Sequence, residues 1–273
     1  FTSKRTAHNT TRLKDRLYVN LNYRFKDSTV SNSPKPGYKY MEPGLYMFPA
    51  YQDTIRSCIL HSPLNPKKEY AYSDLGFILL KFAVEHVTEK SLDQYCQEEF
   101  YRKLGMYHTD FLAHKRLNKN NLVPSCVDKL YRKTELKGYV HDPVAALLGG
   151  IAGHAGLFST AEDLAKMMQL YLNGGTYGGE YYFSPETMAT FSCKNNLFPK
   201  NRRGLGFDKP EPDQTKINPV SKCLPLTSFG HTGFTGIMAW CDPDNKLLYL
   251  FLSNRTYPDE FNTKLSEMNI RTQ

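Results

Sequence analysis

Residues 72–88 read YSDLGFILLKFAVEHVT, and this stretch combines a polar tripeptide with a helical pattern. After Asp74, apolar residues recur at i, i+3, i+4, i+7 and i+8, which is the spacing of one helix face; they are Leu75, Ile78, Leu79, Phe82 and Ala83. Serine and aspartate are preferred N-cap residues, so either Ser73 or Asp74 is expected to cap this helix. The sequence therefore predicts an amphipathic helix that begins directly behind Tyr72.

Further helix signals follow along the chain. Ser91 and Gln94 form a capping-box pair, and Thr160 precedes another periodic apolar segment. A shorter helix is expected from Ser184-Pro185, because proline is favoured at the first helical position. Phe261–Ile270 again shows helical spacing. Together with residues 72–88, these signals predict a mainly helical part over residues 51–190 and a last helix near the C-terminus.

The pattern changes in the last third of the chain. Two apolar runs, Phe234–Trp240 and Leu247–Leu252, are separated by the turn residues of 242–245, which predicts a hairpin. His231-Thr232-Gly233 is expected to open its first strand. Residues 191–273 are thus predicted to form a sheet part with a terminal helix, and residues 1–50 an irregular segment over the core. The fold class is α+β, with one domain over residues 1–273.

Composition excludes several classes of protein. The chain has 273 residues and 40% hydrophobic content, which suits a globular core, and it contains no run of ~18 apolar residues that would span a bilayer. The net charge is +8, but the basic residues are scattered and match no nucleic-acid motif; the densest cluster, Lys200, Arg202 and Arg203, is interpreted as solvated surface. The six cysteines and eight histidines show no metal-ligand spacing, and most cysteines are expected to be free and buried.

The tripeptide Tyr72-Ser73-Asp74 has residues suited to proton transfer. A tyrosine can act as a base if nearby positive charge lowers its pKa, and the positive end of a helix dipole behind Tyr72 would favour the phenolate. Asp74 can point from the same turn toward the same cleft. The alternative for this tripeptide is an ordinary helix cap.

His231-Thr232-Gly233 has residues suited to holding a substrate along a strand. The histidine and threonine offer donors to a carboxylate or carbonyl, and Gly233 leaves room for a substrate backbone. The backbone amide of Phe234 is free to serve as an oxyanion donor. The alternative is a strand start with a structural histidine. The glycine-rich run 149–156 lacks the Gly-Lys-Ser/Thr sequence of a phosphate loop, and His154 within it is expected to be a turn histidine.

Taken together, the two tripeptides and the segment GLFSTAEDL at residues 156–164 resemble the serine β-lactamase and penicillin-binding-protein superfamily, of the class C and DD-peptidase type. The resemblance covers about residues 50–270 and implies a helical subdomain beside an antiparallel sheet flanked by helices. It implies that Tyr72, Asp74 and His231 are catalytic, and that Thr232, Gly233 and Phe234 bind substrate. Residues 141–156 resemble bacterial members, some of which follow a glycoside hydrolase domain.

The chain departs from the family at the nucleophile. No serine is followed three residues later by lysine; Thr11-Arg12-Leu13-Lys14 and Thr134–Lys137 are imitations only. The early strands of the sheet and the nucleophile helix are also expected to be missing from this chain. The interpretation is an N-terminally incomplete member whose remaining residues lie upstream or on another chain.

Two functions follow from the resemblance. The first is acyl-enzyme hydrolysis of a D-alanyl peptide, β-lactam or ester, with the 273 residues inactive as given. The second is a catalytically silent module that binds cell-wall peptide or packs against a partner glycoside hydrolase domain. In either case the resemblance implies no cofactor or metal, no nucleic acid, possible contact with peptidoglycan, and a bacterial periplasm or cell-envelope location.

Overall fold

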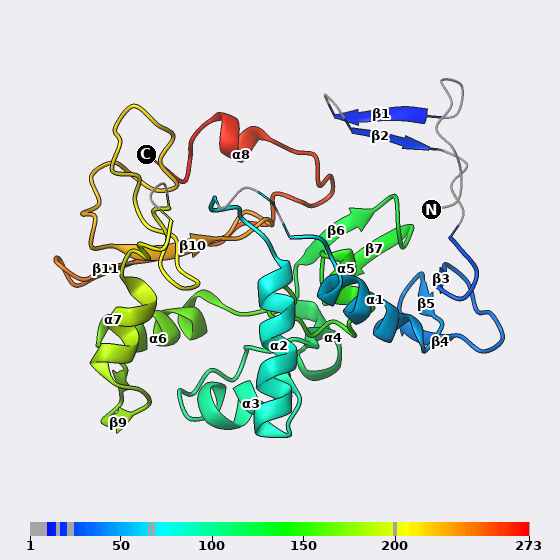
Figure 1. Cartoon of the computed structure of the whole chain (residues 1–273), viewed down its shortest axis with the longest axis horizontal. Helices are drawn as coiled ribbons and strands as arrows, with labels where there is room; N and C mark the ends of the chain where they lie inside the picture. The colour runs from blue at the N-terminus through cyan, green and yellow to red at the C-terminus, as the bar shows by residue number, and fades with distance from the viewer. Residues whose placement is uncertain are drawn as a thin grey trace.

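The computed structural model describes residues 10–14, 17–20, 25–64, 66, 69–198 and 201–272. Helix α2 (Leu75–Thr88) stands near the centre of the molecule, as Figure 1 shows. The sheet β10-β11-β12 and helices α6 and α7 lie on one side of α2, while α5, α1 and the N-terminal strands lie on the other. The architecture is α+β, as the sequence predicts.

The helices expected behind Tyr72, Ser91, Thr160 and Ser184 are present in that order, together with further short helices. Their bounds are α1 (Tyr51–Leu60), α3 (Leu92–Cys96), a π-helical turn η1 (Gln97–Tyr101), α4 (Ala113–Arg116), a 3₁₀ turn η2 (Lys119–Asn121), α5 (Pro143–Leu147), α6 (Ala161–Leu172) and α7 (Pro185–Ser192). The Thr160 hydroxyl accepts from the Asp163 backbone N–H at 3.2 Å, and Ser184 caps α7 in the same way at 3.1 Å. The helix starts predicted at Thr160 and Ser184 are therefore confirmed.

The strands form short antiparallel sheets along the chain. Two of them are the pair β1 (Thr10–Lys14) and β2 (Leu17–Asn20), and the sheet β3-β5-β4, with bounds Val30–Ser31, Leu45–Met47 and Lys39–Glu42. A hairpin of β6 (Pro124–Asp128) and β7 (Thr134–Lys137) and a small pair, β8 (Thr176–Tyr177) and β9 (Glu180–Tyr181), follow. The hairpin β6–β7 lies inside the part expected to be mainly helical. The sequence did not predict it, because its strands show no alternation of apolar and polar residues.

The last sheet contains β10 (Phe229–Thr232), β11 (Met238–Asp242) and β12 (Leu247–Phe251), so the predicted C-terminal hairpin is confirmed. His231 does not open its first strand, however, and lies near the end of β10, paired with Ala239. The chain turns between Gly233 and Ile237, whose backbone groups close the turn at 2.7 Å. Gly236 lies in this turn at a φ of +104°, which explains why the apolar run starting at Phe234 becomes strand only from Met238.

Two other local predictions, the capping box at Ser91 and the length of the last helix, are wrong because side chains make other hydrogen bonds. The Ser91 hydroxyl bonds the Asp93 carboxylate and makes no cap bond, so the capping box with Gln94 does not form. The last helix, α8, is limited to Lys264–Glu267. Arg255 Nη1 donates to the carbonyls of Glu260 and Asn262, at 3.1 and 2.9 Å, and holds the preceding residues out of the helix.

Two buried apolar clusters hold the elements around the site, and α2 belongs to the first of them. Ile78 of α2 packs with Leu45 of β5 and with Ala145 and Ala146 of α5. On the sheet side, Met168 of α6 packs with other buried residues of α7, β10 and β11, which are Met188, Phe229 and Cys241. All six cysteines are free, as expected, but Cys126 and Cys241 alone among them are buried. Helix α2 is thus held by the first cluster and strand β10 by the second.

Candidate active site

Tyr72 and His231 are distant in the sequence and meet in the structure. Tyr72 lies just before Asp74, the N-cap of α2, and His231 lies on β10 beside the turn to β11. Their ring centroids are 6.3 Å apart, and the ring planes are inclined by 35°. Tyr72 is 59% exposed, so this site opens to solvent.

A third side chain, Arg203, connects the two rings. Its Nη1 lies 2.8 Å from Nε2 of His231, and its guanidinium carbon lies 5.0 Å from the centre of the Tyr72 ring. The second distance is within the range of a cation–π contact. Sequence reasoning missed Arg203, because its partners lie far along the chain and no local motif surrounds it.

Arg203 is anchored by a buried carboxylate. Asp208 is 2% exposed, and its Oδ2 accepts from Nη2 of Arg203 and Nη2 of Arg202, each at 2.9 Å. The backbone of Asp208 in turn exchanges two hydrogen bonds with Gly230 of β10, at 2.7 and 3.1 Å. The Asp208 carboxylate thus holds two guanidinium groups, of which that of Arg203 lies beside Tyr72 and His231.

The interpretation of this basic segment as solvated surface is therefore wrong for part of it. The side chain of Arg203 is 18% exposed, and Lys209 is buried with its ammonium donating to three backbone carbonyls, those of Ser192, Thr227 and Ser228. Burial lowers the pKa of Lys209. Arg202 remains partly exposed, and Lys200 lies outside the described residues.

The phenol of Tyr72 has a raised pKa. Partial loss of water around the phenol is the largest cause, and the charge of Asp74 adds to it; the charge of Arg203 opposes it. The expectation of a lowered pKa at the helix N-terminus is thus wrong, because the nearby carboxylate and the loss of water outweigh the cation. At neutral pH the phenol keeps its proton and can donate it.

The remaining predicted residues lie at the end of β10 and in the turn that follows. Thr232 pairs with Met238, and the Gly233 N–H closes the turn. Phe234 is in the turn instead of on a strand, and the residue is 61% exposed. The ring lies 4.9 Å from the His141 ring and 4.5 Å from the guanidinium carbon of Arg255. These contacts hold the turn beside the site.

The glycine-rich run positions the start of α2. A Cβ on Gly153 would lie 2.2 Å from the Phe77 carbonyl oxygen, so only glycine permits this approach. The next residue, His154, is a buried structural histidine whose Nε2 lies 3.0 Å from Asp142 Oδ1. Asp142 caps α5 by accepting from the Ala145 N–H at 2.7 Å. The run therefore packs against helix α2 and carries no phosphate-loop chemistry.

Substituting Gly153 tests this contact. Gly153→Ala should destabilise the protein by about 1–3 kcal/mol, because the added methyl group forces α2 away from the run. Gly76→Ala is the matched control: its Cβ would meet nothing within 4 Å, and alanine is the better helix former, so stability should rise by about 0.5–1 kcal/mol. Urea unfolding of both variants measures the difference. Equal effects of the two substitutions would contradict the packing role of Gly153.

The described parts of the chain contain no group of three or more His, Cys, Asp or Glu side chains that could hold a metal ion. Among the same residues, no helix is long and apolar enough to cross a bilayer.

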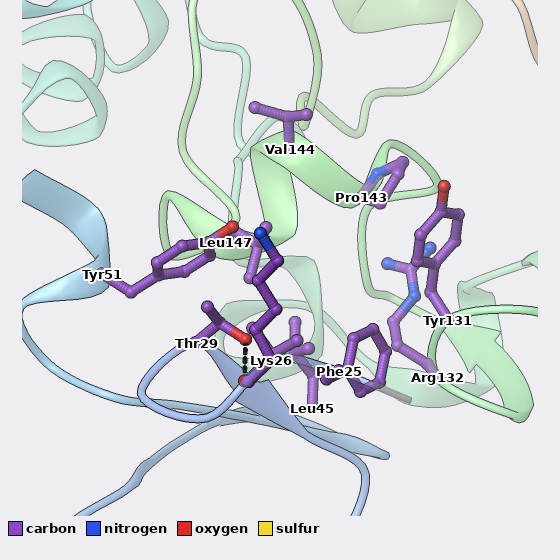
Figure 2. Close-up of a pocket in the computed structure, with 11 residues that line it drawn as sticks. Phe25, Lys26, Thr29, Leu45, Tyr51, Tyr131, Arg132, Pro143, Val144 and Leu147 are labelled. Atoms are coloured by element: carbon purple, nitrogen blue, oxygen red, sulfur yellow. Dashed lines mark hydrogen bonds between the residues drawn. The ribbon is translucent and has the colours of Figure 1, made fainter. Parts of the chain in front are cut away.

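A separate hollow of about 210 Å³ lies between the N-terminal strands and α5, as Figure 2 shows. Its lining is mainly apolar and includes Val30, Leu45, Val144 and Leu147. Neither Tyr72 nor His231 lines it, so it is distinct from the site described above.

Comparison with known proteins gives a consistent result. The sequence profile of the β-lactamase family matches residues 31–269. A protein of Escherichia coli K12, provisionally named a D-alanyl-D-alanine carboxypeptidase, is 35% identical over 213 residues, which cover 73% of this chain and 48% of that protein. A Salmonella gallinarum relative with the same provisional name is 31% identical over 242 residues, covering 81% of this chain and 54% of the relative. The chain thus spans about half the length of the curated relatives it matches.

Solved structures share the fold at low sequence identity. The octameric penicillin-binding protein homologue from Pyrococcus abyssi superposes with a TM-score of 0.50 at 19% identity, covering 81% of this chain and 48% of that one. Simvastatin synthase from Aspergillus terreus also gives 0.50, at 15% identity, covering 81% of this chain and 61% of that one. With a profile match over residues 31–269 and this shared fold, the chain belongs to the β-lactamase family.

Proposed function

We propose that the protein is a serine hydrolase that acts on D-alanyl peptides, or on related β-lactams and esters, through an acyl-enzyme. The observation that carries this proposal is the convergence of Tyr72, His231 and Arg203 at the end of β10. The provisional name of the curated relatives, a D-alanyl-D-alanine carboxypeptidase, supports the substrate class. Because such substrates occur in the bacterial cell envelope, we propose that location for the protein.

In this function Tyr72 passes its own proton to the leaving group and takes up the proton of the attacking hydroxyl, so the phenol is protonated before and after the step. Its raised pKa keeps a proton available for the leaving group, and the cation–π contact with Arg203 holds the ring in place. Asp74 is also proposed to contact the substrate amide. His231 and Arg203 supply the polar and charged wall of the site.

The edge of β10 is the proposed docking strand. The sheet order β10-β11-β12 leaves β10 at an edge, where Gly230 exchanges its outward backbone bonds with Asp208. Because backbone groups alternate along an antiparallel strand, Thr232, two residues on, also directs its backbone outward. A peptide substrate can pair there as an added strand through the Thr232 N–H, while the Thr232 carbonyl accepts from Nδ1 of His231. Gly233 leaves room for the substrate, and the Phe234 amide is proposed to donate to the oxyanion.

The attacking serine is proposed to lie outside these 273 residues, since no serine here has lysine at the third following position. The chain as given should therefore produce no turnover of nitrocefin or of a p-nitrophenyl ester and no covalent penicillin adduct by intact mass. The intact protein should form an adduct on a serine followed by x-x-Lys. Acylation of a residue within 1–273 would refute this part of the proposal.

The same lack of Ser-x-x-Lys favours a second candidate function. A silent module would bind cell-wall peptide without chemistry, or pack against a glycoside hydrolase domain. Intact protein that binds muropeptide reversibly and never forms an adduct would support it. An adduct in the intact protein would exclude it.

A further inference from the structure

The two ring nitrogens of His231 have neighbours that dictate where its proton lies. A guanidinium group has donors only, so Nε2 must offer its lone pair to Arg203 Nη1 at 2.8 Å. A carbonyl oxygen accepts only, so Nδ1 must carry the hydrogen that it donates to the Thr232 carbonyl oxygen at 2.7 Å. Both neighbours require the same neutral tautomer.

From this geometry we propose that Arg203 is a positioning residue: it fixes His231 as a neutral imidazole protonated on Nδ1 and carries the positive charge of the site itself. The resemblance to DD-peptidases would instead give His231 the role of holding a substrate carboxylate or of polarising Tyr72. If His231 were protonated on both nitrogens, its Nε2–H would point at the N–H donors of Arg203, and neither group could accept the other's hydrogen. An anionic substrate group at this wall therefore meets the guanidinium charge of Arg203.

The surroundings of Arg203 make this arrangement rigid. Its Nη2 is held by the buried Asp208, and its backbone N–H donates to Asn201 Oδ1 at 3.0 Å. The carbonyl of Arg203 accepts from the Asn195 N–H at 2.8 Å. The guanidinium is thus held over the Tyr72 ring independently of any substrate, and its charge stabilises the phenolate form of Tyr72.

The neighbouring arginine supplies a matched control. Arg202 shares the Asp208 carboxylate, also at 2.9 Å, and its other described contacts are with the Lys209 carbonyl and Glu211. Arg202→Gln and Arg203→Gln remove the same charge from the same carboxylate, but only the second removes the contacts to His231 and Tyr72. Arg203→Lys keeps a donor and a charge, and should retain the tautomer.

The test is ¹⁵N NMR of the imidazoles in the chain as given, with the His231 signals assigned by their loss in His231→Gln. Wild type should show Nε2 as the unprotonated nitrogen and Nδ1 as the protonated one. Arg203→Gln should lose this single-tautomer signature, while Arg202→Gln and Arg203→Lys should keep it. A protonated Nε2 in wild type would overturn the proposal without any variant, even if Arg203→Gln fails to fold.

The second readout is the titration of Tyr72, followed by its ¹³Cζ signal and assigned with Tyr72→Phe. Arg203→Gln should raise the pKa of the phenol further, because the cation that lowers it is gone; Arg202→Gln should change it less. Equal shifts in the two variants would overturn the positioning role. The catalytic meaning of this inference rests on the proposed function. Neither readout needs turnover, however, so a failure of the Arg203 inference is distinguishable from a failure of the proposed function.

Discussion

In the intact protein, Tyr72→Phe is expected to lower kcat/KM for a D-alanyl peptide by about 10²–10⁴-fold, the usual contribution of a positioned proton-transfer group. The substitution removes only the hydroxyl and leaves the ring that contacts His231 and Arg203. The loss should appear in steady-state kinetics with a chromogenic or peptide substrate, and acylation by penicillin should slow in parallel.

Tyr107→Phe is the control, because Tyr107 is 75% exposed and lies outside the site. The pH profile adds a second check. Since the phenol of Tyr72 has a pKa above its ordinary value of 10.0, it stays protonated near neutral pH, and wild-type activity should show no titration of this group there. A Tyr72→Phe protein with wild-type kcat/KM would end the catalytic role of Tyr72.

Arg132→Ala is expected to reduce the free energy of unfolding by about 3–5 kcal/mol, because it leaves two buried carboxylates without their cation. Arg132 has a side chain 2% exposed and binds Glu42 of β4 and Asp128 of β6, each at 2.6 Å. It also donates to the carbonyls of Val140 and His141, at 2.8 and 2.5 Å. Urea unfolding monitored by fluorescence and circular dichroism measures the loss.

The pKa values of the two carboxyls make this prediction pH-dependent. Burial raises the pKa of Glu42, and the charge of Arg132 only partly opposes it. Burial also raises the pKa of Asp128, but Arg132 and the N–H groups of Tyr131 and Leu130 outweigh burial and lower it. In wild type the contribution of Asp128 is therefore lost as pH falls through its lowered pKa. In Arg132→Ala the deficit should shrink on acidification, as the unpaired carboxyls take up protons.

Lys129→Ala is the matched control for this substitution, because Lys129 is an exposed cation in the turn between β6 and β7 that also contains Arg132. Removing a surface charge should change stability by no more than about 0.5 kcal/mol. An equally small loss in Arg132→Ala would mean that the buried ion pairs contribute no net stability and that the N-terminal strands are held by apolar packing alone.

The sequence predicted the local elements that depend on neighbours a few residues apart. The helix behind Tyr72, the caps at Thr160 and Ser184 and the C-terminal hairpin all follow from spacing, capping residues and turn residues. Local prediction failed where a distant or competing partner took the relevant group. Ser91 bonds Asp93 instead of capping, and Arg255 takes the carbonyls that a longer last helix would need.

The motifs at Tyr72 and His231 were recognisable from residue types alone, because each is a set of particular side chains at fixed local spacing. That the two rings lie 6.3 Å apart, that Arg203 joins them, and that the Tyr72 pKa rises instead of falling were decided by tertiary structure. The physical reason is the separation along the chain of the residues that interact. Helix caps and periodic apolar faces are set by contacts within about one or two turns of chain. Charge, burial and hydrogen bonding at the site depend on residues from α2, β10 and the 201–208 segment, which are neighbours only in the folded protein.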